Sequence, residues 1–86
     1  MDTQHLQAFV AIAESGSFSG AGERLHLTQP AISKRIAILE EQIKAKLFDR
    51  VGRQVVLTQA GNLLLNKATN ILNEVSAAKR EIADLR

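Results

Sequence analysis

The last third of the sequence limits the possible folds most strongly, because it predicts one helix too long for a small domain to cover. From Gln59 to Arg86 there is no proline, and apolar residues recur at alternating steps of four and three. These residues are Leu64, Ala68, Ile71, Val75, Ala78, Ile82 and Leu85. A helix of this length spans about 40 Å at 1.5 Å per residue. A heptad seam along it predicts a second helix packed against it, so we expect a homodimer through this segment.

The rest of the chain has room for only one small domain. The sequence has 86 residues, of which 45% are hydrophobic and 23% charged, as in ordinary globular proteins. Such a chain is too short to form two cores with a cleft between them, which disfavours most enzymes. No apolar run reaches the roughly 20 residues that a membrane helix needs, and the first residues lack the basic-then-apolar layout of a signal peptide. We therefore expect no membrane association and a cytoplasmic location.

Three helices are predicted in the first half of the chain, of which the second is short and the third is longer. Asp2 or Thr3 can cap the first helix, Ser17 or Ser19 the second, and Thr28 the third. Pro30 fits the first turn of the third helix, where its missing N–H costs nothing. The apolar faces comprise Leu6, Phe9, Val10 and Ala13 in the first helix and Ile32, Ile36, Leu39 and Ile43 in the third.

Two glycines interrupt the second predicted helix, which runs to about Leu25. Gly20 and Gly22 each weaken a helix by about 1 kcal/mol relative to alanine. Gly22 therefore indicates either close packing against a neighbour or local softness, and the sequence leaves both readings open.

A β-hairpin is predicted between the third helix and the long last one. The runs 47–50 and 54–57 favour strands on either side of Gly52, and Thr58 can cap the last helix. The predicted fold is therefore mainly α: three helices, a two-stranded hairpin and a long helix, arranged as a winged helix-turn-helix. Three leucines lie off the heptad seam and are expected to pack on the chain's own domain: Leu63, Leu65 and Leu72.

Positive charge is concentrated in the middle of the sequence. Residues 24–53 contain seven Lys or Arg against three Asp or Glu, whereas residues 1–23 contain no Lys or Arg. The excess coincides with the third helix and the hairpin, so we expect a polyanion to bind there.

The start of the third helix has side chains suited to nucleic acid. Gln29 can pair with adenine through its amide, Ser33 can bond a base edge or a phosphate, and Lys34 can reach guanine or a phosphate. These three are predicted to read bases in the major groove. Phosphate contacts are predicted for Thr28, Arg35 and Arg50, and a minor-groove or backbone contact for Arg53 at the hairpin tip.

No catalytic, metal-binding or cofactor-binding site is predicted. His5 and His26 are isolated, and the chain has no cysteine to complete a zinc or disulfide site. Glu40 and Glu41 are adjacent on a helix, so their side chains diverge by about 100° and cannot act as a catalytic pair.

Several motifs resemble one known family. The runs Ser17-Phe18-Ser19, Thr28-Gln29-Pro30-Ala31-Ile32-Ser33, Leu47-Phe48-Asp49-Arg50 and Leu57-Thr58-Gln59-Ala60-Gly61 together resemble the DNA-binding domain of LysR-type transcriptional regulators. The resemblance implies a winged helix-turn-helix over residues 1–58 and a dimerising linker helix over 59–86. It assigns the same base, phosphate and wing roles to the residues named above.

The resemblance also implies partners and a larger protein. Double-stranded DNA with an interrupted inverted repeat would be the target. Family members carry a C-terminal domain that binds a small-molecule effector, so we expect this chain to be a fragment without that domain, and the full-length protein would be a homotetramer.

Two alternatives remain open from the residues themselves. A winged helix with a heptad helix can also serve as a protein-interaction or dimerisation module without binding DNA specifically. A different winged-helix family would share the DNA chemistry but form another dimer. The basic segment disfavours the first alternative, and the length of the last helix disfavours the second.

Overall fold

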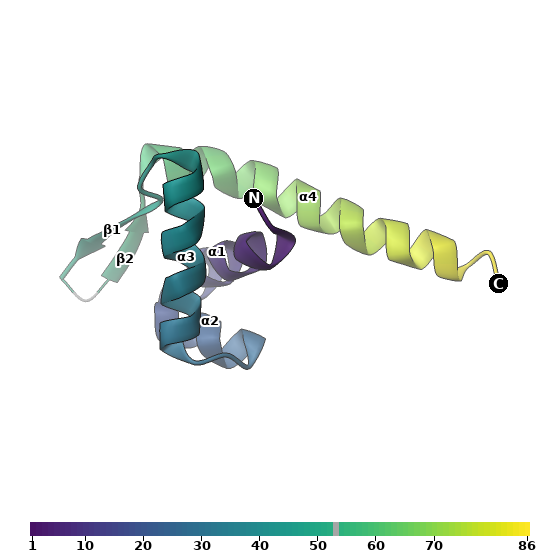
Figure 1. The fold of residues 1–86 in the computed structure, drawn as a ribbon, viewed down its shortest axis with the longest axis horizontal. Coiled ribbons are helices and arrows are strands. Elements are labelled where there is room, and N and C mark those ends of the chain that lie inside the picture. Colours follow the sequence, from purple (N-terminus) through teal and green to yellow (C-terminus); the bar gives the residue numbers. More distant parts are fainter. Residues whose placement is uncertain (53) are drawn as a thin grey trace.

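The computed structural model describes residues 1–52 and 54–86. Its elements follow in the predicted order of three helices, a hairpin and a long helix, as Figure 1 shows. They are α1 (Thr3–Ser15), α2 (Phe18–Leu25), α3 (Gln29–Ile43), β1 (Phe48–Val51), β2 (Gln54–Leu57) and α4 (Gln59–Ala83). The winged helix-turn-helix prediction is therefore confirmed.

Polar caps at the four helix starts explain why the helices begin where they do. In each case a side-chain oxygen accepts a hydrogen bond from a backbone N–H two or three residues along, which satisfies one otherwise unpaired donor. At α2 the cap is Ser17, not Ser19, and its hydroxyl accepts from Gly20 N at 2.9 Å. The other caps are Asp2, Thr28 and Thr58.

The hydrophobic core lies where α1 meets the other helices. Phe9 and Ile12 of α1, Ile32 and Leu39 of α3, and Leu47 after α3 are its largest fully buried side chains. Each such side chain stabilises the fold by about 1.5–3 kcal/mol relative to an exposed one. Burial of these side chains fixes the position of α3 in the core. The opposite face of α3 is left exposed to solvent.

The hairpin is an antiparallel pair that aligns Phe48 with Leu57 and Val51 with Gln54. The first strand begins one residue later than predicted, because Leu47 is fully buried in the core and lies outside the strand. Phe48 then attaches the hairpin to the helices, since its ring centroid lies 5.3 Å from that of Phe9.

The segments α3, hairpin and α4 meet in close contact at Leu47. Its N–H donates to the Glu40 carboxylate at 2.8 Å, and its carbonyl oxygen accepts from Thr58 N at 3.0 Å. A Cβ on Gly61 would lie 2.2 Å from that same oxygen. Only glycine fits at this approach, so the glycine of the last sequence motif has a packing role.

The first half of α4 belongs to the same core as α1, α2 and α3. Leu64 is 7% exposed and Ala68 is fully buried, so the prediction that these two residues face a dimer partner is wrong. In this part of α4 the heptad positions lie on the same face of the helix that packs on the core, so the chain's own domain covers both residues. Leu65 and Leu72 pack on the core as predicted, but Leu63 is 66% exposed, contrary to prediction.

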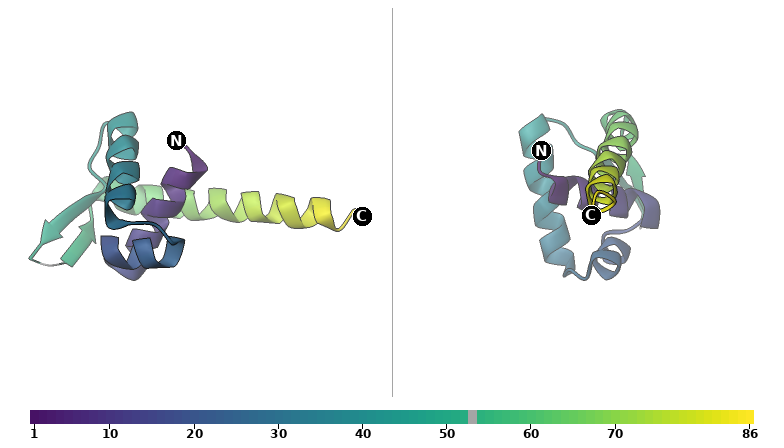
Figure 2. Two further views of the ribbon diagram at one scale, coloured as in Figure 1. Left: turned by 60° about the horizontal axis from the view of Figure 1, so that its bottom comes forward. Right: turned by 90° about the vertical axis from the view of Figure 1, so that its right-hand side faces the viewer.

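The second half of α4 projects away from the domain. Figures 1 and 2 show this helix extending well past the other elements, in a molecule measuring 50 × 25 × 19 Å. Residues 73–86 contain no buried side chain. The remaining seam residues are all exposed, namely Ile71, Val75, Ala78, Ile82 and Leu85. Within the described residues, no helix is both long and apolar enough to cross a bilayer.

Candidate nucleic-acid interface

A close backbone approach fixes the angle between α2 and α3. Gly22 is buried, and a Cβ at this position would lie 2.6 Å from the carbonyl oxygen of Leu27. The N–H of Leu27 also donates to the carbonyl of Gly22 at 2.8 Å. The sequence left open whether Gly22 marks close packing or softness, and the structure shows close packing. The turn that leads into α3 is therefore held firmly against α2.

Gln29 opens α3 and is exposed to solvent. Its side-chain oxygen accepts a hydrogen bond from the Ser19 hydroxyl at 3.3 Å. Beside it, Thr28 Oγ1 accepts from Ala31 N at 3.2 Å, which leaves the threonine O–H free to donate outward. The beginning of α3 thus presents an amide and a hydroxyl on one exposed surface.

Ser33 is less accessible than Gln29 and Lys34. It is half-buried and lines a hollow of about 230 Å³ between α3 and the hairpin. Phe18, Phe48 and Arg50 line the same hollow. The structure therefore places Ser33 one turn after Gln29 on α3, beside the hollow that Arg50 also lines.

Ion pairs neutralise part of the basic segment. Arg24 pairs with Glu14 at 2.6 Å, Lys44 pairs with Glu41, and Lys46 lies 3.9 Å from Glu40. Within residues 1–52 and 54–86, the structure shows no carboxylate within 4.0 Å of Lys34, Arg35 or Arg50. The uncompensated positive charge of α3 and the described part of the hairpin is thus carried by these three residues.

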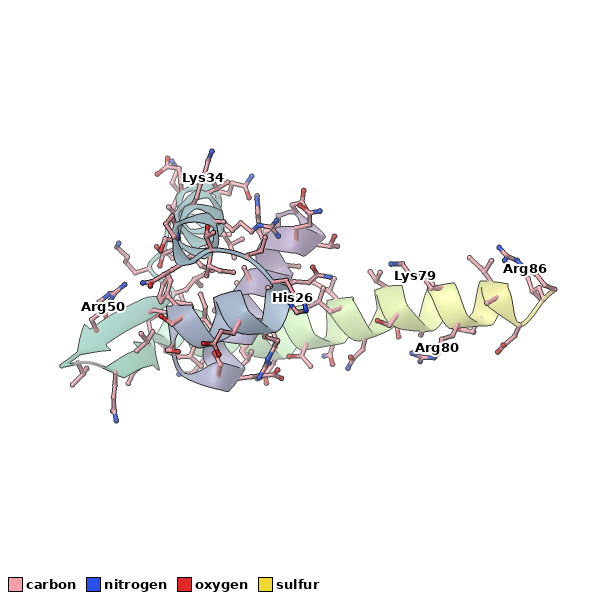
Figure 3. The ribbon with its side chains drawn as sticks, turned by 90° about the horizontal axis from the view of Figure 1, so that it is seen from below. His26, Lys34, Arg50, Lys79, Arg80 and Arg86 are labelled. Atoms are coloured by element: carbon pink, nitrogen blue, oxygen red, sulfur yellow. The ribbon has the colours of Figure 1, made fainter. Side chains whose placement is uncertain are left out.

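Neutral groups hold two of these three cations. The guanidinium of Arg50 lies 5.1 Å from the Phe18 ring centroid, and Arg35 Nη1 donates to the carbonyl of Gln4 at 3.5 Å. A neutral partner orients a guanidinium without cancelling its charge. Figure 3 shows Lys34 projecting from α3 and Arg50 from β1, at the opposite end of the molecule from Lys79, Arg80 and Arg86.

Two residues contribute to this surface although the sequence does not predict them as site residues. Phe18 supports Arg50, and Ser19 contacts Gln29. Both belong to the Ser17-Phe18-Ser19 run, which the sequence offers only as a family motif. Their roles depend on how α2 lies against α3 and β1. The predicted wing residue, Arg53, lies outside the residues that the structure describes.

The surface described above carries the kinds of side chain that bind nucleic acid. It combines exposed amide, hydroxyl, ammonium and guanidinium groups, which are the groups that contact base edges and phosphates. Across residues 1–52 and 54–86 the structure has no group of three or more His, Cys, Asp or Glu side chains that could hold a metal ion.

Known proteins are similar to this chain in sequence and in fold. Residues 3–62 match the family described as bacterial regulatory helix-turn-helix protein, lysR family. An uncharacterized HTH-type transcriptional regulator in the ibpB-leuC intergenic region of Azotobacter vinelandii is 58% identical over 85 residues, covering 99% of this chain. The chain spans only 59% of that relative's length.

Two solved structures that are similar to this chain contain DNA. The CbnR_DBD–DNA complex superposes with a TM-score of 0.89 at 34% identity and covers all of both chains. The complex of BenM_DBD with catB site 1 DNA superposes with a TM-score of 0.95 at 32% identity, covering 99% of this chain and 96% of that one. From the family match over residues 3–62, the chain belongs to the LysR family of bacterial regulatory helix-turn-helix proteins.

Proposed function

We propose that this chain binds double-stranded DNA sequence-specifically, with the start of α3 in the major groove. Two features carry the proposal. Gln29 and Lys34 are both exposed on α3, and Arg50 keeps a positive charge that no carboxylate among the described residues neutralises. A major groove about 12 Å wide admits one helix, and residues near its N-terminus then reach base edges. CbnR_DBD and BenM_DBD, whose folds match this one, are each found in a complex with DNA.

Each side chain has a role that follows from its chemistry. Gln29 pairs with adenine, Lys34 contacts guanine or a phosphate, and Ser33 bonds a base edge from its half-buried position. Thr28, Arg35 and Arg50 hold phosphates, because a free O–H and two guanidinium groups are strong donors to oxyanions. For Arg53 the proposed minor-groove or backbone contact rests on the sequence alone.

The exposed part of the α4 seam supports a homodimer. Ile71 is 40% exposed, Val75 37%, Ile82 59% and Leu85 85%. An isolated helix shorter than about 12–15 residues is marginal in water, so a projecting half-helix needs a partner to be stable. A second α4 with the same seam supplies that partner and places two α3 helices about a two-fold axis. We therefore infer an interrupted inverted repeat as the DNA target.

The larger protein and its setting are inferred from family membership. We infer that the complete regulator carries an effector-binding domain for a small molecule and assembles as a homotetramer. The chain itself has a binding role and no catalytic one. Since bacterial DNA lies in the cytoplasm, a regulator that binds it works there.

Selection from a random pool of duplexes tests the proposed function. The 86-residue chain is incubated with the pool near physiological salt, bound duplexes are sequenced, and the affinity for the winner is compared with that for a scrambled duplex. We expect a symmetric, interrupted motif and a preference of at least about a thousandfold, as for other specific DNA-binding proteins. Recovery of no motif would instead favour a protein-interaction module.

A further inference from the structure

Ser19 carries an exposed hydroxyl that has no role in capping its own helix. Ser17 caps α2, since its Oγ accepts from Gly20 N at 2.9 Å. The Ser19 hydroxyl instead reaches across to α3 and donates to Gln29 Oε1 at 3.3 Å. It therefore contacts a side chain to which the proposed function assigns base reading.

The backbone between these two helices fixes this contact. Ser19 and Gly22 are three residues apart in α2, so they lie on the same face of the helix. Gly22 is in close contact with the turn before α3, where a Cβ would lie 2.6 Å from the Leu27 oxygen and 3.8 Å from Gln29 N. Because this approach is so close, α2 cannot shift away from the start of α3 without losing the hydrogen bond between Leu27 N and the Gly22 carbonyl.

We propose that Ser19 is a positioning residue that sets the base preference of Gln29, an inference that rests on the proposed function. An amide oxygen has two lone pairs, so Oε1 can accept from Ser19 and still accept from the exocyclic amino group of adenine. The same contact directs Nε2 away from α2, toward the position where N7 of that adenine lies in the major groove. The amide is thus oriented before DNA arrives, which lowers the entropy cost of ordering a long exposed side chain.

The inference separates specificity from affinity. Removing the hydroxyl with Ser19→Ala lowers the preference for adenine at the base pair that Gln29 reads by about three- to tenfold, the worth of one hydrogen bond. Affinity for scrambled duplexes stays the same, because no phosphate contact is lost. Alanine favours helix more than serine does, so the variant keeps its fold, which circular dichroism verifies. Ser19→Thr keeps a hydroxyl and retains the preference.

The test uses the duplex selected from the random pool, made in four versions at the base pair where Gln29→Ala relaxes the preference. Affinities are measured for the unaltered chain, Ser19→Ala, Ser19→Thr, Gln29→Ala and the double variant. Ser76→Ala, which removes an exposed hydroxyl from the projecting part of α4, is the matched control. We expect Ser19→Ala to reduce discrimination in the unaltered chain and to change nothing further in the Gln29→Ala background.

Three results overturn the inference in distinguishable ways. Equal weakening of all four duplexes by Ser19→Ala means that the hydroxyl contacts a phosphate and does not position Gln29. Unchanged discrimination means that Gln29 reads its base without help. In both cases the proposed function stands. If the unaltered chain itself prefers none of the four duplexes and no selected sequence, then the proposed function fails, and the role of Ser19 fails with it.

Discussion

The guanidinium of Arg50 lies 5.1 Å from the ring centroid of Phe18, so a cation on the hairpin rests on an aromatic residue of α2. The Phe18 ring in turn meets Phe48 edge to face, with centroids 6.1 Å apart. The hairpin is therefore joined to the helices through aromatic contacts that leave the arginine charge uncompensated. Arg50 is held in place without an acidic partner among the described residues, as a phosphate ligand should be.

Arg50→Ala is expected to weaken binding to specific and scrambled duplexes alike. Loss of one phosphate contact also reduces the slope of log affinity against log salt by about one unit. Fluorescence anisotropy with labelled duplexes from low to moderate salt measures both quantities. Arg80→Ala is the matched control, because Arg80 is an exposed arginine on the projecting part of α4 (Figure 3). An Arg50→Ala slope equal to that of the control contradicts the phosphate role.

Gly22→Ala is expected to destabilise the fold by about 1–3 kcal/mol, the usual effect of overpacking. The added Cβ would lie 2.6 Å from the backbone oxygen of Leu27, which can move only if the turn between α2 and α3 shifts. Gly20→Ala is the comparison within the same helix, since its Cβ would meet Ser17 Oγ and the Cβ and Oγ of Ser15 at 2.9–3.0 Å but no backbone atom, so we expect a smaller loss, from displacement of the Ser17 cap. Urea unfolding followed by circular dichroism distinguishes the two. Similar stabilities for both variants are incompatible with a rigid α2–α3 turn.

His26→Gly is expected to stabilise the protein by about 1 kcal/mol. His26 ends α2 with φ 58° and ψ 43°, a left-handed conformation that costs a side chain about 1–2 kcal/mol and costs glycine little. Its side chain is exposed, so little packing is lost. Thermal unfolding measures the change, and His26→Ala, which keeps a Cβ, should show no such gain. An unchanged or lowered melting temperature for His26→Gly argues against strain at this cap.

Val75→Asp is expected to convert dimers to monomers. The residue is 37% exposed and lies in the part of α4 that extends beyond the core. The new carboxylate is therefore solvated in the monomer and would be buried without a partner only in the dimer, which it destabilises. Ser76→Asp adds the same charge to the neighbouring position, off the seam. Sedimentation velocity of both variants at matched concentrations separates the effects. Dimers that persist in Val75→Asp place the interface elsewhere.

Local sequence patterns predicted the elements well because short-range chemistry decides them. Asp2, Thr28 and Thr58 each cap the helix that follows, and Pro30 stands in a first turn. A cap acts within three residues of its helix, so it can be identified without tertiary structure. The same holds for the strand-favouring runs 47–50 and 54–57, which predicted the hairpin to within one residue.

Contacts between elements could not be predicted in the same way. Leu64 and Ala68 fit both a heptad and a core face, and only the packing of α1 against α4 shows that the core covers them. The sequence likewise could not show that Leu63, which was expected to pack on the chain's own domain, faces solvent, because this too depends on how α4 lies against the core. The pairing of Arg24 with Glu14 and the contact of Ser19 with Gln29 each join different helices. The charge and orientation of the binding surface therefore depend on tertiary structure.

The position of α3 on DNA is the central claim, and methylation protection of the selected duplex tests it most directly. Dimethyl sulfate modifies N7 of guanine in the major groove and N3 of adenine in the minor groove. The account predicts protection of guanine N7 atoms in two clusters on one face of the duplex, separated by one helical turn or a multiple of it. A bound duplex whose major-groove N7 atoms all remain reactive would contradict the placement of α3 in the major groove.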